Sequence, residues 1–316
     1  MTLRWASMTD VDREREYSPS PCLADGDYQP YVVHYRQASD AAWSRVRERS
    51  EASTHAIAFG DFDTRTIDVA VPASDQPVPL LAFIHGGYWQ ELTAADSRFA
   101  ADACLARGWG FAAIDYTLAP DASLDQIVEE CRRAVRSLAD RAESLGVDTT
   151  RLVLAGSSAG AHLAAMAAIN SGGDGPERAG TNTGIAGVVL VSGIFELEPL
   201  IGTSINEQLG LDRPSAQRNS PLGLDVAGIP TALVAYGSDE TSEFKAQSDA
   251  FGRHLEAAGT SVSMLEVAGR NHFDVILDLA EPDTPLGDAV ERLMRSLRGL
   301  ATPGRRRRPG PRPCRR

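Results

Sequence analysis

The sequence lacks the features that mark secreted, membrane-spanning and metal-binding proteins. Its cysteines are scattered, none forms a Cys-x-x-Cys pair, and no disulfide framework is indicated: Cys22, Cys104, Cys131 and Cys314. The first 16 residues hold no apolar signal core, and no apolar run reaches membrane-spanning length. The histidines show no ligand spacing such as His-x-x-x-His. We therefore expect a cytoplasmic protein that needs no metal or other cofactor and does not associate with a membrane.

The chain also lacks the positive charge on which general nucleic-acid binding depends. It has 31 basic and 43 acidic residues, a net charge of −12. Seven arginines lie in residues 305–316, and the rest of the chain has 24 basic and 43 acidic residues, a net charge of −19. Such a body excludes binding through a phosphate footprint. The Pro- and Arg-rich tail, residues 302–316, is predicted to be disordered.

What the chain does contain is an alternation of apolar strands and helices. Strands are predicted over 80–84, 110–115, 152–155, 185–191, 231–236 and 261–267, and helices over 93–107, 124–145, 162–169, 243–258 and 286–297. Earlier segments predict a helix over 39–49 and an antiparallel pair over 55–59 and 66–71. The alternation indicates an α/β fold with a mostly parallel sheet covered on both faces. We expect one domain over residues 1–301, with a small cap insertion over 195–225.

The most informative stretch is a Gly-x-Ser-x-Gly sequence between a strand and a helix. Residues 152–155 predict the strand, Gly156, Ser158 and Gly160 form the motif, and the helix follows. This order is typical of the nucleophile elbow of an α/β-hydrolase. The glycines remove Cβ atoms where strand and helix approach, and the helix N-terminus directs free N–H groups at the apex. Ser158 is therefore the candidate nucleophile.

A second glycine pair is the candidate oxyanion hole. Gly86 and Gly87 follow His85 at the end of the predicted strand 80–84. In this fold that loop donates N–H groups to the substrate carbonyl, together with the residue after the nucleophile, here Ala159. His85 is interpreted as a loop-shaping hydrogen bonder rather than a base.

The base and the acid should follow later strands. His272 lies in the loop after the last predicted strand, whereas the other histidines lie before the sheet or on helices. Asp239 and Glu240 are adjacent in the loop after strand 231–236, and the residues alone leave open which of them orients His272. Together these residues predict acyl transfer through a Ser-His-acid triad.

The motifs resemble those of kynurenine formamidase (arylformamidase), a family of α/β-hydrolases. The resemblance rests on His-Gly-Gly-Tyr-Trp-Gln at 85–90, on 156–164, on Tyr-Ser-Pro-Ser at 17–20 and on 240–248 and 271–273, and it spans most of residues 15–300. It implies hydrolysis of N-formyl-L-kynurenine to L-kynurenine and formate. The family's acid lies three residues before a Glu-Phe pair, which points to Glu240, although an Asp is expected in animal members.

An aryl formamide substrate suggests further contacts. Tyr88 and Trp89 could stack on the aryl group or pack the mouth of the loop. His162, one turn beyond Ser158, is also a candidate residue of the substrate site, and its expected role is packing or hydrogen bonding. Arg218 and Ser220, in the expected cap, are candidates for holding the substrate carboxylate.

Three alternatives remain open at this point. The first is a broad-specificity carboxylesterase with the same triad, and the second is a deformylase or deacylase of secondary metabolism. The third is a non-catalytic relative that binds a ligand, although such proteins usually lack the Ser or the His. The sequence does not determine the oligomeric state, and a homodimer is kept as a hypothesis.

Overall fold

An eight-stranded sheet forms the centre of the computed structural model, which describes residues 5–59, 65–169, 184–279 and 281–297. The strands lie in the order β1-β2-β4-β3-β5-β6-β7-β8. The antiparallel part is β1 paired with β2 and β2 with β4, and all other neighbours are parallel. The bounds are β1 (Ala52–Phe59), β2 (Arg65–Pro72), β3 (Val78–Ile84), β4 (Gly110–Ile114), β5 (Val147–Ser157), β6 (Ile185–Val191), β7 (Thr231–Gly237) and β8 (Ser261–Val267). The predicted fold class is confirmed.

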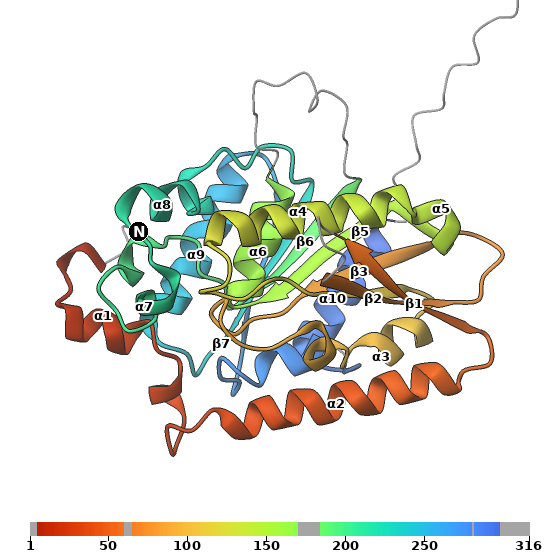
Figure 1. Ribbon diagram of the computed structural model, residues 1–316, viewed down its shortest axis with the longest axis horizontal. Coiled ribbons are helices and arrows are strands. Elements are labelled where there is room, and N and C mark those ends of the chain that lie inside the picture. Colours follow the sequence, from red (N-terminus) through yellow and green to blue (C-terminus); the bar gives the residue numbers. More distant parts are fainter. Residues whose placement is uncertain (1–4, 60–64, 170–183, 280, 298–316) are drawn as a thin grey trace, which may run out of the picture.

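Helices cover both faces of this sheet (Figure 1). One layer contains α4, α6 and α9, and the other contains α2, α3 and α10. The α-helices are α1 (Asp10–Glu16), α2 (Gln29–Glu48), α3 (Ala101–Ala106), α4 (Leu124–Asp140), α5 (Ala142–Leu145), α6 (Ala159–Ala168), α7 (Asn206–Leu209), α8 (Arg213–Arg218), α9 (Ser242–Ala257) and α10 (Pro285–Ser296). The 3-10 helices are η1 (Trp5–Ser7), η2 (Ser20–Cys22), η3 (Ala94–Ser97), η4 (Glu198–Leu200), η5 (Pro221–Gly223) and η6 (Val275–Leu279).

The continuous apolar run of β3 shows why both faces must be covered. Successive side chains of a strand point to opposite faces. Leu80 and Ile84 belong to the core under α4 and α6, whereas Leu81 and Phe83 belong to the core over α2 and α3. A strand buried on both sides has no polar face to expose, so alternation is absent from its sequence.

Several predicted helices have different bounds in the structure. Helix α2 begins at Gln29, ten residues before the predicted segment, and α6 begins directly after Ser158. The segment 93–107 is divided into η3 and α3, and 124–145 into α4 and α5. The start of α4 follows from a capping box, in which Ser123 and Gln126 satisfy each other's backbone amides. The predicted tail, 302–316, lies outside the described residues.

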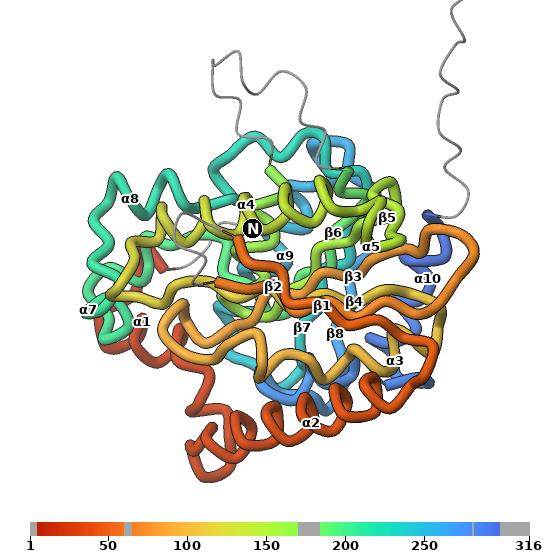
Figure 2. Tube along the Cα trace, turned by 45° about the vertical axis from the view of Figure 1, so that its right-hand side comes forward, coloured from red at the N-terminus to blue at the C-terminus, as the bar shows by residue number. Residues whose placement is uncertain are grey.

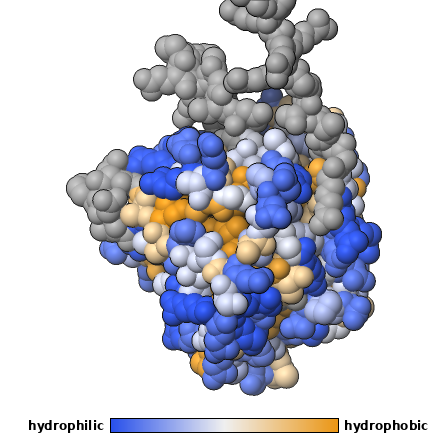
Figure 3. All heavy atoms as spheres, turned by 90° about the vertical axis from the view of Figure 1, so that its right-hand side faces the viewer, coloured by the Kyte–Doolittle hydropathy of each residue, from blue (hydrophilic) through white to orange (hydrophobic). Residues whose placement is uncertain are grey.

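The surface is mixed in polarity. The tube in Figure 2 shows α2 running along the outside of the molecule, and the side seen in Figure 3 carries mostly hydrophilic residues around a band of hydrophobic ones. Among the described residues, no helix combines the length and the apolar character that crossing a bilayer requires.

The first turn of α6 lies against the strands with no room for side chains. A Cβ on Gly160 would lie 2.0 Å from the carbonyl oxygen of Ile84 on β3, and a Cβ on Gly156 would lie 2.2 Å from the carbonyl oxygen of Gly160. Contacts this short do not occur for real Cβ atoms, so both positions require glycine. The two outer residues of the Gly-x-Ser-x-Gly motif therefore permit the crossing of α6 over β5 and β3.

We expect Gly160→Ala to lower the free energy of unfolding by about 3 kcal/mol, because the added methyl group meets rigid backbone rather than a side chain that can turn away. Denaturant unfolding measures this change. Gly223→Ala is the matched control: a Cβ there meets nothing within 4 Å, and a shift within about 0.5 kcal/mol is expected. Equal stabilities of the two variants would contradict the steric account.

Candidate active site

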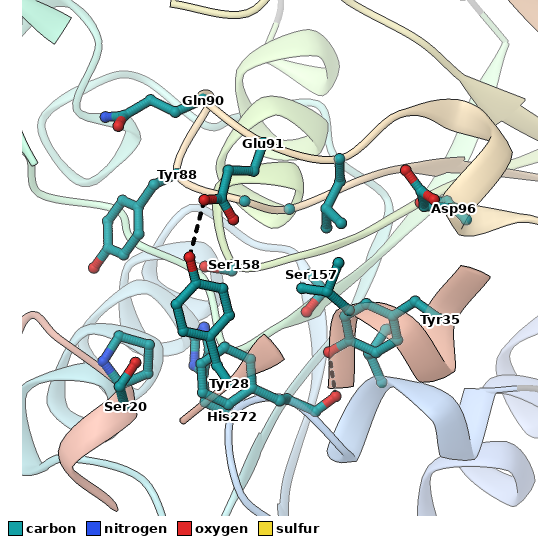
Figure 4. A pocket seen from close by; sticks show the side chains of 18 of the residues that line it. Ser20, Tyr28, Tyr35, Tyr88, Gln90, Glu91, Asp96, Ser157, Ser158 and His272 are labelled. Carbon is teal, nitrogen blue, oxygen red and sulfur yellow. Dashed lines mark hydrogen bonds between the residues drawn. The ribbon is translucent and has the colours of Figure 1, made fainter. Parts of the chain in front are cut away.

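A cavity of about 340 Å³ lies where the parallel strands end. Open α/β sheets bind ligands at the carboxyl ends of their strands. The wall is built from the loops that follow β3, β5 and β8, and from the N-terminal segment (Figure 4). Of the predicted site residues, five lie in this wall: Gly86, Gly87, Tyr88, Ser158 and His272.

Ser158 lies at the turn between β5 and α6 in a backbone conformation that side chains rarely adopt. Its φ is 55° and its ψ is −120°, and such strain persists only where the surroundings enforce it. Its amide donates to the carbonyl of Val191 at 2.8 Å, which ties the turn to the end of β6. A Cβ on Gly86 would lie 2.9 Å from the carbonyl oxygen of Ser157, so the loop after β3 approaches the elbow closely.

His272 is held by a buried carboxylate. Its Nδ1–H donates to Oε2 of Glu240 at 2.8 Å, and both residues are buried. The other carboxylate oxygen, Oε1, accepts from the Ser192 hydroxyl and from the Gly237 amide, each at 2.6 Å. Burial of a carboxylate is tolerated when its oxygens are hydrogen-bonded in this way. With Nδ1 protonated, Nε2 of the neutral ring is an acceptor.

The structure pairs Glu240, and not Asp239, with His272. Asp239 is exposed, and its carboxylate accepts from the Ser238 hydroxyl. The backbone amide of Asp239 donates to the carbonyl of Arg270 at 2.9 Å, which joins the two loops. A Cβ on Gly237 would lie 2.2 Å from that same carbonyl oxygen. This close approach turns the first acid outward and the second toward His272.

The loop after β3 presents its amides in a tight turn of three consecutive positive φ angles. They are 91° at Gly87, 48° at Tyr88 and 61° at Trp89. The carbonyl of Gly87 accepts from two amides further along the turn, at 2.8 and 3.0 Å. The backbone amides of Gly86, Gly87 and Ala159 donate no hydrogen bond to any residue that the structure describes. Such amides can stabilise a developing oxyanion.

Of the three expected substrate contacts, only Tyr88 lines the cavity. Trp89 is fully buried, and its ring meets the edge of His162 at 5.1 Å between centroids and 90° between planes. His162 is also fully buried, and its Nε2–H donates to the carbonyl of Asn219 at 2.7 Å. The positions of Trp89 and His162 do not support substrate contact. The positive φ of Trp89, which the sequence does not reveal, turns the indole inward.

The N-terminal segment supplies wall residues that the sequence reasoning missed. Tyr28 and Tyr35 line the cavity, and Tyr28 stacks on Phe273, next to His272, at 5.6 Å and 11°. The hydroxyl of Thr241, in the loop beside Glu240, donates to the carbonyl of Glu16 at 2.5 Å. The only local signal was the spacing of Tyr28, Tyr31 and Tyr35, which share one face of a helix.

The segment 195–225, expected as a cap, contributes Ser204 and Ile205 to the wall. Gln90 donates to the carbonyl of Ile205 at 2.9 Å. The two candidates for the carboxylate site lie elsewhere: Arg218 pairs with Asp125 at 2.7 Å on the surface, and the buried Ser220 donates to a backbone carbonyl.

Comparison with known proteins identifies the family of this chain. Kynurenine formamidase of Danio rerio is 32% identical over 283 residues, which cover 88% of this chain and 94% of that protein. The chain belongs to the kynurenine formamidase family. The enzyme of the same name from Salmo salar is 31% identical and covers 92% of this chain and 98% of its own. The family resemblance predicted from the motifs is thereby confirmed.

Two further matches place this kynurenine formamidase relative among esterase-like folds. The family model described as BD-FAE matches residues 67–223. The solved esterase of Pyrobaculum calidifontis superposes with a TM-score of 0.67 at 21% identity, over 86% of this chain and 93% of that one. The structural likeness supports the α/β-hydrolase fold.

The buried His162 of this kynurenine formamidase relative predicts a loss of stability in acid. Burial lowers the pKa of His162 from its ordinary 6.5 to about 4, so the unfolded chain takes up the proton first. The contribution of neutral His162 to the free energy of unfolding is fully present above pH 6.5 and is lost as the pH falls toward 4. The free energy of unfolding decreases by about 3 kcal/mol in the limit. Denaturant unfolding at several pH values across this window measures it.

Two variants isolate the contribution of His162. His162→Gln keeps an N–H donor for Asn219 and removes the titration, so its stability should fall less between pH 6.5 and 4 than that of the wild type. His55→Gln, at an exposed position on β1, should keep the wild-type dependence. An unchanged pH dependence in His162→Gln would contradict the assignment.

Proposed function

We propose that this chain hydrolyses the formamide of N-formyl-L-kynurenine to L-kynurenine and formate. The observation that carries the proposal is the Glu240–His272 pair on the same cavity as Ser158, in a member of the kynurenine formamidase family. A carboxylate that fixes Nδ1–H leaves Nε2 free to take a proton from a serine hydroxyl.

In the proposed first half-reaction, Oγ of Ser158 attacks the formyl carbon while Nε2 of His272 takes its proton. The amides of Gly86, Gly87 and Ala159 stabilise the oxyanion, and each such donor contributes about 3 kcal/mol to the lowering of a barrier of this type. The carbon–nitrogen bond then breaks, and protonated His272 gives its proton to the departing aryl amine. Glu240 stabilises the imidazolium throughout.

In the second half-reaction, water attacks the formyl ester on Ser158 and passes a proton to His272. The new tetrahedral intermediate collapses, formate leaves, and Ser158 recovers its proton. Every step uses side chains and amides of this chain and one water molecule. The wall offers aromatic rings for the aryl group in Tyr88, Tyr28 and Phe273.

Carboxylesterase activity is the second candidate, because the BD-FAE model matches residues 67–223 and the fold is like that of a solved esterase. An ester and a formamide need the same nucleophile and oxyanion hole, so this alternative differs in the pocket alone. A deformylase or deacylase of secondary metabolism would differ in the leaving group.

The remaining parts of the proposal concern organisation. We propose that residues 1–301 act as one domain with 195–225 as a small cap, supported by the contact of Ser204 and Ile205 with the cavity. A cytoplasmic location and a homodimer stay predictions, which cell fractionation and light scattering of the purified chain would test.

The deciding experiment is product detection. Purified protein with N-formyl-L-kynurenine should release L-kynurenine, followed by its absorbance, and formate, followed by a coupled assay, in equal amounts. The same preparation is given p-nitrophenyl esters. Efficient ester turnover without formamide hydrolysis would favour the esterase and overturn the proposed substrate.

Variants of the two adjacent acids test the roles within the site. We expect Glu240→Gln to lower kcat by about 10⁴-fold, because the imidazole loses the partner that fixes its tautomer. Asp239→Asn, a matched change on an exposed carboxylate, should stay within about threefold of the wild type. Single-turnover and steady-state kinetics give both values, and the opposite ranking would move the acid to Asp239.

A further inference from the structure

The carboxylates that line the cavity differ in whether a basic side chain neutralises them. Two carboxylates line the wall, those of Asp96 and Glu91. Asp96 is buried and is paired with Arg36 at 2.8 Å. Glu91 is exposed and has no ion-pair partner among the described residues. No lysine or arginine lines this cavity in the part of the chain that the structure describes.

Glu91 is held close to the amides proposed for the oxyanion hole. Its own amide donates to the carbonyl of Gly87 at 3.0 Å, within the tight turn that follows β3. A Cβ on Gly87 would lie 2.4 Å from the carbonyl oxygen of Glu91, so the turn closes on Glu91 only because position 87 is a glycine. The backbone of Glu91 is therefore held beside Gly87.

The side chain of Glu91 is directed by a tyrosine. The Tyr28 hydroxyl donates to Oε1 of Glu91 at 2.9 Å, and Figure 4 shows the two groups facing each other at the cavity. Tyr28 stacks on Phe273, and Tyr31 stacks on the same ring at 5.5 Å. One carboxylate beside aromatic rings offers what an organic ammonium group binds: an opposite charge and electron-rich ring faces.

We propose that Glu91, oriented by Tyr28, binds a primary ammonium group of the substrate, so that the enzyme selects aryl formamides that carry a cationic amine. The inference rests on the proposed function and names its specificity residue. A carboxylate without a cationic partner, in the same cavity as a developing oxyanion, raises the energy of that charge, and a bound ammonium removes the repulsion. The substrate carboxylate has no cationic partner in the described wall and stays in solvent.

The first test varies the substrate and needs no mutation. Three formamides are compared, the first being N-formyl-L-kynurenine. The second, 3-amino-1-(2-formamidophenyl)propan-1-one, lacks the carboxylate. The third, 4-(2-formamidophenyl)-4-oxobutanoic acid, lacks the amine. Loss of the amine should lower kcat/KM about tenfold, and loss of the carboxylate should change it less than about threefold. Equal rates on the deaminated analogue, or a larger loss without the carboxylate, would overturn the proposal.

The second test removes the negative charge of Glu91, which is proposed to bind the amine. In Glu91→Gln the ratio of kcat/KM for the amine-bearing and amine-free substrates should fall about tenfold, and in Tyr28→Phe, which keeps the ring stacking, about threefold. Glu207→Gln is the matched control: it removes an exposed carboxylate on α7 that does not line the cavity, and the ratio should stay at the wild-type value. If Glu91→Gln fails to fold, Tyr28→Phe and the substrate series still decide.

A third measurement separates this inference from the proposed function. Kynuramine, which keeps the amine, and 4-(2-aminophenyl)-4-oxobutanoate, which lacks it, are tested as inhibitors of p-nitrophenyl acetate hydrolysis. Kynuramine should inhibit about tenfold more tightly, with less difference at high salt. If kynuramine inhibits more tightly but no formamide is hydrolysed, the proposed formamidase activity is refuted and the amine site is supported. If the two compounds inhibit equally, only the amine site is refuted.

Discussion

The close approach of α6 to β3 and β5 is the constraint on which the rest of the site depends. Only hydrogen atoms fit between Gly160 and the carbonyl of Ile84, and between Gly156 and Gly160. Because the helix begins at this distance, Ser158 is forced into its strained φ of 55° at the top of the sheet. The same crossing brings the loop after β3 beside the elbow, so that one packing contact positions both the proposed nucleophile and the proposed oxyanion amides.

The parts of the site that were predictable from the sequence are those set by local order along the chain. Ser158 could be identified because strand, turn and helix are contiguous, and each leaves its own pattern. His272 could be identified because parallel strands bring their carboxyl ends to one edge, so a histidine after the last strand returns to the elbow. The fold class followed in the same way from alternation, because a buried parallel strand needs helices on both faces.

The parts that were not predictable depend on contacts between distant segments or on backbone conformation. Asp239 and Glu240 have the same local surroundings in sequence, and only the family resemblance pointed to Glu240. In the structure they are separated by the approach of Arg270 to Gly237 and by a hydroxyl from Ser192 at the end of β6. Trp89 faces the core because its φ is positive, and a tryptophan in the sequence does not predict that conformation. Tyr28 reaches the cavity through a ring contact with Phe273, almost the whole chain away.

The charge of the cavity follows from the same architecture. The loop after β3 must turn sharply to expose the amides of Gly86 and Gly87, and the turn closes on the carbonyl of Gly87 within four residues. The residue at that position therefore lines the same cavity as Gly86, Gly87 and Ser158. Here it is Glu91, in a protein body that is strongly acidic and in a wall without lysine or arginine among its described residues. A neutral acyl group whose leaving group carries an ammonium suits such a wall better than one whose leaving group lacks it. The ammonium offsets the charge of the Glu91 carboxylate when negative charge develops on the carbonyl oxygen.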